Sequence, residues 1–386
     1  MMNETTAHYN LLMLSGDQSI ARGQDTAFYR LLERFSRYWQ RIDILTPAAP
    51  DAKPCTIHGN VFVHPAPRHR LLQPLFIKQK GEQLLAEREY HLVTSHDFGF
   101  FYNGIGAYWL LRKRSIPLVS EIHHVEGYPL AVNLREKLWR WTAMRYLPFV
   151  GARAAALRVV NRQVPPLLRE LGVPDEKILV LYSLYLDFDL YQPISDVNPE
   201  YDVLFVGRLA SNKGILLLVD AIAAVTRTHP DVRLAIRGEG PLKAEIQAKI
   251  TALNLQKNIV FLPRIADTAA MADLYRRSRM LVCASTVEGN PRVTIEAMAC
   301  GVPVISTPVG IMPDVIQDGE NGYLFDWQPD QLAEQIGLLL DDPDLQARVG
   351  EAGRQSVQQF DAESVIRAYA AAYHSIIEEN EERSHA

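Results

Sequence analysis

The chain has 386 residues, of which 48% are hydrophobic and 22% charged, and 40 Lys and Arg against 45 Asp and Glu give a formal net charge of −5. Since one hydrophobic core rarely serves more than about 250–300 residues, this length predicts two domains, and the ordinary composition excludes a disordered chain. No run reaches the ~18 consecutive apolar residues of a membrane-spanning helix, and the start has no basic-then-apolar leader, so we expect a cytoplasmic protein.

The three cysteines, Cys55, Cys283 and Cys300, are widely spaced and form no CxxC or Cys/His ligand pattern. We therefore expect them to be reduced core residues. We expect no metal site and no nucleic-acid partner.

In the first half, short apolar runs alternate with stretches of helical length, a pattern typical of a parallel sheet with crossover helices. The strands expected there are Asn10–Leu14, Ile42–Leu45, Val61–His64, His91–Thr94, Pro117–Ile122, Leu157–Val160 and Ile178–Leu181. A polar stretch from Asp187 to Tyr201, with two prolines, interrupts the pattern. The pattern thus predicts a Rossmann-like N-terminal domain over residues 1–190.

The alternation restarts after that stretch. The strands expected in the second half are Val203–Val206, Val232–Ile236, Ile259–Leu262, Met280–Cys283, Pro303–Ile305 and Gly322–Phe325. They predict a second, doubly wound parallel-sheet domain over residues 191–360. Residues 361–386 read as a helix and a charged tail, with one apolar face formed by Val365, Ala368, Tyr369, Ala372 and Ile376.

In open α/β sheets, ligands bind beyond the carboxyl ends of the strands, so the residues after each strand are the candidates for chemistry. Gly207-Arg208-Leu-Ala-Ser-Asn-Lys213-Gly214 directly follows one strand and opens a helix. Two cations five residues apart at a helix N-terminus can meet both phosphates of a diphosphate. The alternative is an ordinary solvated cationic loop, and the Walker pattern is absent.

A second loop, Arg237-Gly238-Glu-Gly240-Pro, follows the next strand. Glycines there permit a tight turn and the close approach of backbone to a flat ring or a phosphate. A lone GxG is also the mark of a simple turn, and both interpretations stay open at this point.

A third segment runs from Glu288 through Gly-Asn-Pro-Arg-Val-Thr-Ile to Glu296. We expect Glu288 at the mouth of a loop and Glu296 in the first turn of the helix that follows. Carboxylates accept hydrogen bonds from hydroxyl groups, so such a pair suits a ribose or another polyol. Taken singly, Glu296 could instead complement the helix dipole, and Glu288 could be a solvated loop acid.

Together these segments resemble the family-four glycosyltransferases of the GT-B fold. The most specific likeness is Glu288 and Glu296 followed by Ala-Met-Ala-Cys-Gly-Val-Pro-Val-Ile, joined to Gly-Arg-Leu and Lys-Gly of the 207–214 loop in the expected order. The resemblance spans nearly the whole chain. It implies two Rossmann-like domains facing across a cleft, an acceptor side in the first and a donor site in the second, and a C-terminal helix that packs back on the first.

The resemblance also implies retaining transfer of a sugar from a UDP- or GDP-sugar to an acceptor hydroxyl, without a metal. Arg208 and Lys213 would then hold the diphosphate and stabilise its growing charge, Glu288 would contact sugar hydroxyls, and Glu296 the ribose. The remaining donor contacts are assigned to Gly207, Gly238, Gly240, Gly289, Asn290 and Arg292.

In the first half, the family places a glycine loop after the first strand and a histidine after a middle strand. The resemblance implies that these residues lie near the transferred sugar, and the candidates here are Gly23 as a donor-binding residue and His123 as a catalytic residue. The sequence departs from the family in having a single glycine, Gly23, where two are common, and in Asn290-Pro291 where Phe-Gly is common. Since Pro291 has no N–H, one backbone donor to the sugar is missing.

No motif in the sequence identifies the acceptor. Residues 112–162 hold ten basic and three acidic residues, and Arg135 to Arg145 interleave cations with tryptophans, which suits peripheral contact with an anionic membrane or a solvated basic helix. A lipid-linked, sugar or small-molecule acceptor is compatible with this. Other activities that fit the same fold are a sugar-nucleotide epimerase, a phosphorylase and a catalytically silent sugar-nucleotide-binding protein.

Overall fold

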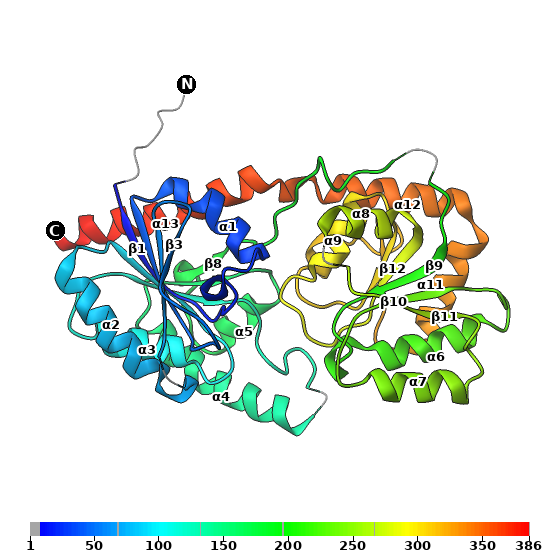
Figure 1. Cartoon of the computed structure of the whole chain (residues 1–386), viewed down its shortest axis with the longest axis horizontal. Helices are drawn as coiled ribbons and strands as arrows, with labels where there is room; N and C mark the ends of the chain where they lie inside the picture. The colour runs from blue at the N-terminus through cyan, green and yellow to red at the C-terminus, as the bar shows by residue number, and fades with distance from the viewer. Residues whose placement is uncertain (1–7, 68, 132, 195–196, 266, 386) are drawn as a thin grey trace. The chain divides into compact units, whose positions relative to one another are not determined.

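The structure, a computed structural model, describes residues 8–385 except 68, 132, 195–196 and 266. It comprises two compact units (Figure 1). Unit 1 consists of Met1–Glu126, Arg135–Ser183 and Glu363–Ala386, and unit 2 of Gly127–Leu134 and Leu184–Ala362. The main passage between the units therefore falls a few residues before the boundary expected at 190, and the C-terminal helix is part of unit 1.

Unit 1 is built on an eight-stranded sheet with the strand order β3-β4-β2-β1-β5-β6-β7-β8. The strands are β1 (Asn10–Leu14), β2 (Arg41–Thr46), β3 (Cys55–Ile57), β4 (Val61–Pro65), β5 (Leu92–His96), β6 (Leu118–Ile122), β7 (Ala156–Val159) and β8 (Ile178–Val180). All neighbours are parallel except β3, which runs antiparallel to β4 at the edge. Strand β3 is not among the strands expected from the sequence, because three residues are too few to show an alternating pattern.

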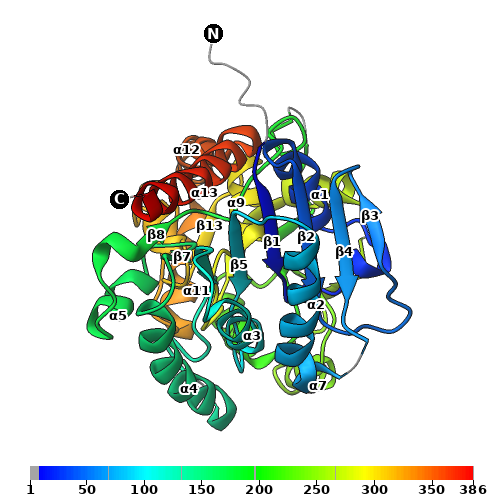
Figure 2. The same cartoon turned by 90° about the vertical axis from the view of Figure 1, so that its left-hand side faces the viewer.

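The helices of unit 1 cover both faces of this sheet (Figure 2). They are α1 (Ala27–Phe35), α2 (Gln73–Glu87), α3 (Tyr102–Leu111), α4 (Leu134–Gly151), α5 (Val164–Glu170) and α13 (Ala362–His385), where the first residues of α4 and α13 belong to unit 2. Helix α13 packs beside α1, where the rings of Phe35 and Tyr369 stack with centroids 4.6 Å apart.

Unit 2 is built on a six-stranded, fully parallel sheet with the order β11-β10-β9-β12-β13-β14. The strands are β9 (Tyr201–Val206), β10 (Leu234–Arg237), β11 (Ile259–Leu262), β12 (Ser278–Cys283), β13 (Val304–Ser306) and β14 (Tyr323–Leu324). Consecutive residues such as Val203 and Leu204 are both fully buried, since helices cover both faces of the sheet. The predicted two-domain α/β fold with parallel sheets is confirmed.

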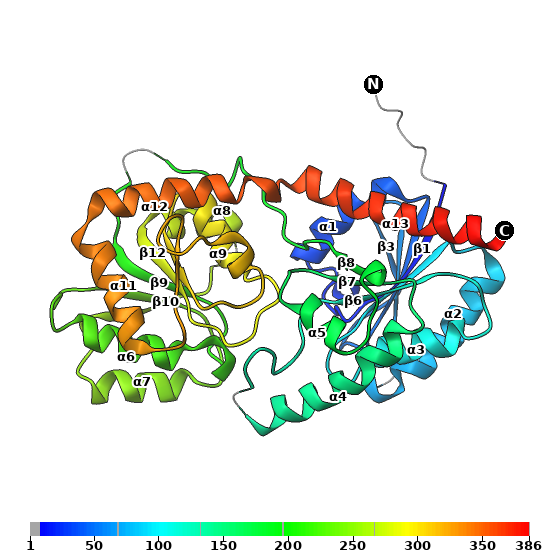
Figure 3. The same cartoon turned by 180° about the vertical axis from the view of Figure 1, so that it is seen from behind.

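Helices α6, α7 and α11 lie on one face of the unit 2 sheet, and α8, α9 and α12 on the other (Figure 3). Their bounds are α6 (Ile215–Val225), α7 (Lys243–Ala252), α8 (Thr268–Arg276), α9 (Arg292–Ala299), α10 (Met312–Val315), α11 (Pro329–Asp341) and α12 (Pro343–Ser356). The core on the α6 face joins residues such as Leu218 and Ile336 to Phe205 and Ile236 of the sheet. Each such side chain stabilises the fold by roughly 1.5–3 kcal/mol when buried.

Two expectations about side chains need correction. The buried face of α13 is Ile366, Tyr369, Ala370, Tyr373 and Ile377, whereas Ala368 is exposed. The three cysteines are free, but only Cys283 and Cys300 are buried, because Cys55 lies on the half-covered edge strand β3. Across the described residues, no helix is long and apolar enough to cross a membrane.

Candidate functional site

The predicted donor-binding residues gather at one edge of the unit 2 sheet. Strand β9 pairs with β10 on one side and β12 on the other, and all three run parallel. Their carboxyl ends therefore lie next to one another, and the segments that begin at Gly207, Gly238 and Ala284 leave the sheet side by side. The sheet order brings together residues that are about 80 positions apart in the chain.

The loop after β9 passes through a short 3-10 turn, Ser211–Lys213, into α6. Gly214 links the two with φ +64°, and a Cβ on it would lie 1.9 Å from the carbonyl oxygen of Ala284. Only glycine fits such a backbone without strain. The backbone N–H of Thr286 donates to the carbonyl of Asn212 at 2.9 Å, which ties this loop to the one after β12.

The two predicted phosphate-binding cations differ in their surroundings. Arg208 is exposed, and among the described residues its side chain has no ion-pair partner. Lys213 is partly buried and pairs with Glu288, one of the two predicted carboxylates. The Ser285 hydroxyl also donates to Oε1 of Glu288 at 2.8 Å. The structure thus brings a residue predicted to bind phosphate, Lys213, into direct contact with one predicted to bind the sugar, Glu288.

Glycines allow the neighbouring loops to touch. A Cβ on Gly238 would lie 1.9 Å from the carbonyl oxygen of Gly207, and a Cβ on Gly240 would lie 2.4 Å from that of Leu209. The backbone N–H of Leu209 donates to the carbonyl of Glu239 at 2.9 Å. Close backbone packing between two loops therefore requires these glycines, whether or not a nucleotide also approaches them.

The loop from Gly289 to Pro291 leads into α9. It packs against Gly310, whose added Cβ would lie 2.2 Å from the carbonyl oxygen of Gly289. Asn290 is half-buried in this loop. The turn at Gly310 therefore helps to shape the loop that the donor is expected to meet.

Glu296 does not lie in the first turn of its helix. Helix α9 begins at Arg292, which places Glu296 in the second turn, so the helix-dipole interpretation of this carboxylate is wrong. Its Oε1 accepts from the Tyr191 hydroxyl at 3.0 Å and from Nε of Arg292 at 2.7 Å, and its Oε2 accepts from the Tyr275 hydroxyl at 2.8 Å. A carboxylate offers about four acceptor positions, so a ribose hydroxyl could still bind at Oε2.

In unit 1, His123 lies just beyond the carboxyl end of β6. It lies next to His96, which was not among the site residues predicted from the sequence. His96 ends the adjacent strand β5, and the two imidazole centroids are 4.3 Å apart. Burial lowers the pKa of His96 to about 3 and also lowers the pKa of His123, although Glu121 opposes the latter shift. Both rings are therefore neutral at ordinary pH.

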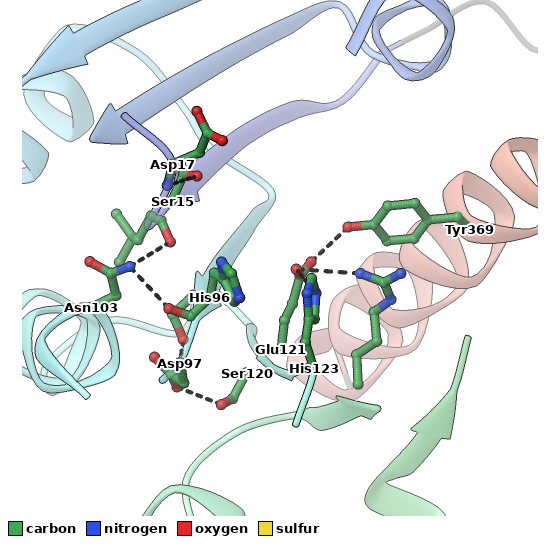
Figure 4. Close-up of polar contacts among 12 residues, drawn as sticks. Ser15, Asp17, His96, Asp97, Asn103, Ser120, Glu121, His123 and Tyr369 are labelled. Carbon is green, nitrogen blue, oxygen red and sulfur yellow. Dashed lines mark hydrogen bonds and ion pairs between the residues drawn. The ribbon is translucent and has the colours of Figure 1, made fainter. Parts of the chain in front are cut away.

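Figure 4 shows a polar network behind these histidines. The Asn103 amide donates to the backbone carbonyls of Leu14 and His96 and so links the ends of β1 and β5. The next residue, Asp97, is buried, and its carboxylate accepts hydrogen bonds from the hydroxyls of Ser120 and Tyr146, both at 2.6 Å. The strand-end rule could have singled out His96 and Asp97, but the adjacency of β1, β5 and β6 is not visible in the chain order.

Gly23 lies in the segment that connects β1 to α1, but it is not the glycine next to β1. It caps the 3-10 helix Ile20–Arg22 with φ +67°, and its backbone N–H donates to the carbonyl of Ile20. The glycine next to the strand is Gly16, where a Cβ would lie 2.2 Å from the ring of Phe98. A hollow of about 430 Å³ opens beside it and is lined by Gly16, Asp17, Gln18, Ser19, Arg22, Gln24, Pro47 and Phe98.

A larger hollow of about 1100 Å³ lies at the opposite edge of the unit 1 sheet, where β6 and β7 begin. It is lined by Pro117, Ala155 and residues of α13, but by none of the predicted site residues. Because ligands of open parallel sheets bind at the carboxyl edge, we assign the chemistry to that edge.

Two family models cover most of the chain. The model of glycosyl transferases group 1 matches residues 189–356, and that of the glycosyl transferase 4-like domain matches residues 22–183. The chain is 32% identical to the D-inositol 3-phosphate glycosyltransferase of Streptomyces scabiei over 313 residues, which are 74% of this chain and 69% of the relative.

A second relative is the N-acetyl-alpha-D-glucosaminyl L-malate synthase of Bacillus anthracis, with 30% identity over 55% of this chain. The match spans only 57% of that relative's length. Among solved structures, Anabaena HepE in complex with UDP and glucose superimposes with a TM-score of 0.74 at 21% identity, covering 95% of this chain and all of HepE, which is a likeness of fold. The chain belongs to the glycosyltransferases of family four, which share the GT-B fold.

Proposed function

We propose that this protein transfers a sugar from a nucleoside diphosphate sugar, with retention of anomeric configuration, to an acceptor hydroxyl. The observation that carries this proposal is the contact of Lys213 with Glu288 at the junction of the β9 and β12 loops. A donor that spans both residues would place its phosphates on the lysine and its sugar hydroxyls on the carboxylate. The UDP complex of the Anabaena neighbour supports such a donor.

The same residues supply a mechanism. Negative charge grows on the diphosphate as the glycosidic bond breaks, and Arg208, Lys213 and the N-terminal turn of α6 can stabilise it. In this proposal the departing phosphate oxygen helps remove the proton of the acceptor hydroxyl, which attacks from the face that the phosphate leaves. The two cations do what a divalent metal does elsewhere, so we propose that full activity persists in excess EDTA; loss of activity would contradict that part.

Alanine variants of the two cations test the proposal. Removing one preorganised charge donor costs about 10²–10³-fold in turnover, so Arg208→Ala and Lys213→Ala should each lose that much. The control is Lys257→Ala, another exposed cation of unit 2. Donor binding is followed by thermal unfolding, where a ligand at 100 times its Kd adds about 2.7 kcal/mol. Near wild-type rates in both variants would refute the assignment.

Product analysis separates the alternatives. Turnover of a UDP- or GDP-sugar without any acceptor would indicate an epimerase, and turnover that needs only phosphate would indicate a phosphorylase. Binding of donor without turnover under any condition would indicate a silent sugar-nucleotide-binding protein.

We further propose that α4 rests on an anionic membrane and brings the enzyme to a lipid-linked acceptor. Leu134, Leu138 and Trp141, at helical spacing along α4, have 83%, 52% and 52% of their surface exposed. Cations flank them, and the Arg145 guanidinium lies 3.6 Å from the centroid of the Trp141 ring. Each Lys or Arg near an anionic surface contributes about 1 kcal/mol to binding.

Sedimentation with vesicles tests this contact. The protein should pellet with phosphatidylglycerol vesicles but not with phosphatidylcholine vesicles, and Leu138→Asp should abolish pelleting. Leu338→Asp is the matched control, since Leu338 is an exposed leucine of α11, 46% exposed, outside α4. Equal pelleting of wild type and Leu138→Asp would exclude α4 as the contact.

A further inference from the structure

Glu121, one residue before the end of β6, is a buried carboxylate that the proposed mechanism has not used. Only 5% of its surface is exposed, although it is charged. Its Oε1 accepts from the Tyr369 hydroxyl at 2.6 Å and from the Tyr373 hydroxyl, both on α13. Its Oε2 lies 3.3 Å from Nη1 of Arg158 on β7. Figure 4 shows Tyr369 pointing toward Glu121 from the helix.

This carboxylate is ionised. Burial alone would raise the pKa of Glu121, but Arg158, His123 and Tyr369 outweigh burial and hold its pKa well below the usual range. Arg158 is itself 2% exposed, and its guanidinium stacks 4.0 Å from the centroid of the Tyr369 ring. Burying an ion pair such as Glu121 and Arg158 costs free energy unless hydrogen bonds satisfy both groups. The position of Glu121, two residues before His123, suggests a functional reason for keeping this pair.

The reason lies in the position of Oε2. It is 3.4 Å from Nε2 of His123, and that nitrogen is buried and makes no hydrogen bond of ordinary geometry with any described residue. A negative oxygen beside Nε2 repels a lone pair on that nitrogen and attracts a proton. A neutral imidazole carries one proton, so placing it on Nε2 leaves Nδ1 as the acceptor.

We propose that Glu121 is a positioning residue that fixes His123 as the Nε2-protonated tautomer and thereby offers Nδ1 to accept a hydrogen bond from a substrate hydroxyl. The two tyrosines of α13 contribute by occupying Oε1, which leaves Oε2 to face the histidine. This inference rests on the proposed sugar transfer and on the expectation, drawn from the family resemblance, that His123 lies near the transferred sugar.

The tautomer of His123 can be observed directly. Long-range proton–nitrogen NMR correlations on protein labelled with ¹⁵N-histidine show which ring nitrogen carries the proton, and the His123→Asn spectrum assigns the signal. Wild type should show Nε2–H, and Glu121→Gln, which removes the charge but keeps the shape, should shift the proton toward Nδ1. Glu363→Gln is the matched control on α13, where Glu363 accepts from Tyr38 at 3.1 Å, and it should leave the tautomer unchanged.

Activity supplies a second readout. Asparagine can place an acceptor where Nδ1 stood and glutamine where Nε2 stood, so His123→Asn should keep roughly tenfold more kcat/KM than His123→Gln. Glu121→Gln should lower kcat about 10- to 100-fold, as expected when a carboxylate that orients a functional imidazole is lost, with KM for the donor little changed.

The outcomes separate the two proposals. An Nδ1–H tautomer in wild type overturns the inference about Glu121, and this measurement does not require any Glu121 variant to fold. If His123→Ala retains full activity, the expectation that His123 contacts substrate is wrong, whatever its tautomer. If His123→Ala is impaired but the asparagine and glutamine variants are equal, the assignment of Nδ1 as the acceptor is overturned.

Discussion

Asp97 shows how a single residue at the carboxyl edge of unit 1 is tuned by its surroundings. Its Oδ2 accepts from the hydroxyls of Ser95, Ser120 and Tyr146. Burial nevertheless raises its pKa to about 6, because these neutral donors do not replace the hydration that an ionised carboxylate loses. Among the described residues, no cation forms an ion pair with Asp97 as Arg158 does with Glu121, and the pKa values of the two carboxyl groups therefore shift in opposite directions.

This shift predicts a pH dependence of stability. Since the folded pKa of about 6 lies above the unfolded value of about 3.9, the folded state binds more protons in this window, and the contribution of Asp97 to the free energy of unfolding falls as pH rises from 4 to 6. The Asp97→Asn protein has no carboxyl group at this position, so it does not lose this part of the free energy of unfolding as the pH rises. Its free energy of unfolding relative to wild type should rise by up to roughly 3 kcal/mol between pH 4 and pH 7.

Urea unfolding of wild type and Asp97→Asn at several pH values measures the difference. Taking the difference also removes the contribution of His96, whose lowered pKa gives the opposite slope in both proteins. Asp25→Asn is the control, since the hydrogen bond from Arg30 lowers the pKa of Asp25 and its difference should move the other way. A difference for Asp97→Asn that is flat with pH would contradict the prediction.

Helix α13 packs against the sheet of unit 1 and contributes to the polar network beside His123. Its buried side supplies Tyr369 and Tyr373 to Glu121, and the ring of its His374 meets Trp39 edge-on at 4.9 Å. Sequence periodicity placed the apolar face about one position too early. Alanines and isoleucines are so frequent in this helix that two overlapping faces fit the period, and only contact with the sheet selects one.

Two adjacent isoleucines of α13 distinguish these faces. Ile377 is 1% exposed, so Ile377→Ala should lower the free energy of unfolding by about 2–5 kcal/mol through lost burial and a cavity. Ile376, which belongs to the face read from the sequence, is only half-buried, and Ile376→Ala should cost less than half as much. Chemical denaturation measures both; equal losses would mean that the helix packs through the face expected from the sequence.

The chain forms two units with separate cores, and the predicted catalytic and donor-binding residues all belong to unit 2 except Gly23 and His123. A ligand that binds only the folded form of one unit stabilises that unit against local opening. Adding the nucleoside diphosphate of the true donor should therefore slow amide exchange most in residues 207–214, 238–242 and 285–296.

Hydrogen exchange followed by mass spectrometry tests this distribution. The edge strand β3 of unit 1 is the internal control, since it lies at the far edge of its sheet from β6, and its exchange should not change. The Arg208→Ala protein at the same nucleotide concentration should show less protection in all three segments. Protection centred on unit 1 would place the nucleotide in the wrong unit and overturn the donor assignment.

The alternation of strands and helices, the two domains and the loops that carry Arg208, Lys213, Glu288 and Glu296 could all be predicted from the sequence. These features are local, because apolar periodicity and glycine turns are written in neighbouring residues. Which side chains contact those residues depends on the tertiary structure. Sheet order brings Lys213 to Glu288, and Tyr191, from the segment before β9, donates a hydrogen bond to Glu296.

The network behind His123 was decided by tertiary structure alone. Glu121 and the tyrosines of α13 are about 250 residues apart in the chain, and Arg158 arrives on a different strand. In the sequence each of them looks like an ordinary strand or helix residue. They form a network only because particular strands are adjacent and a particular face of α13 is buried. Packing of the whole core fixes both.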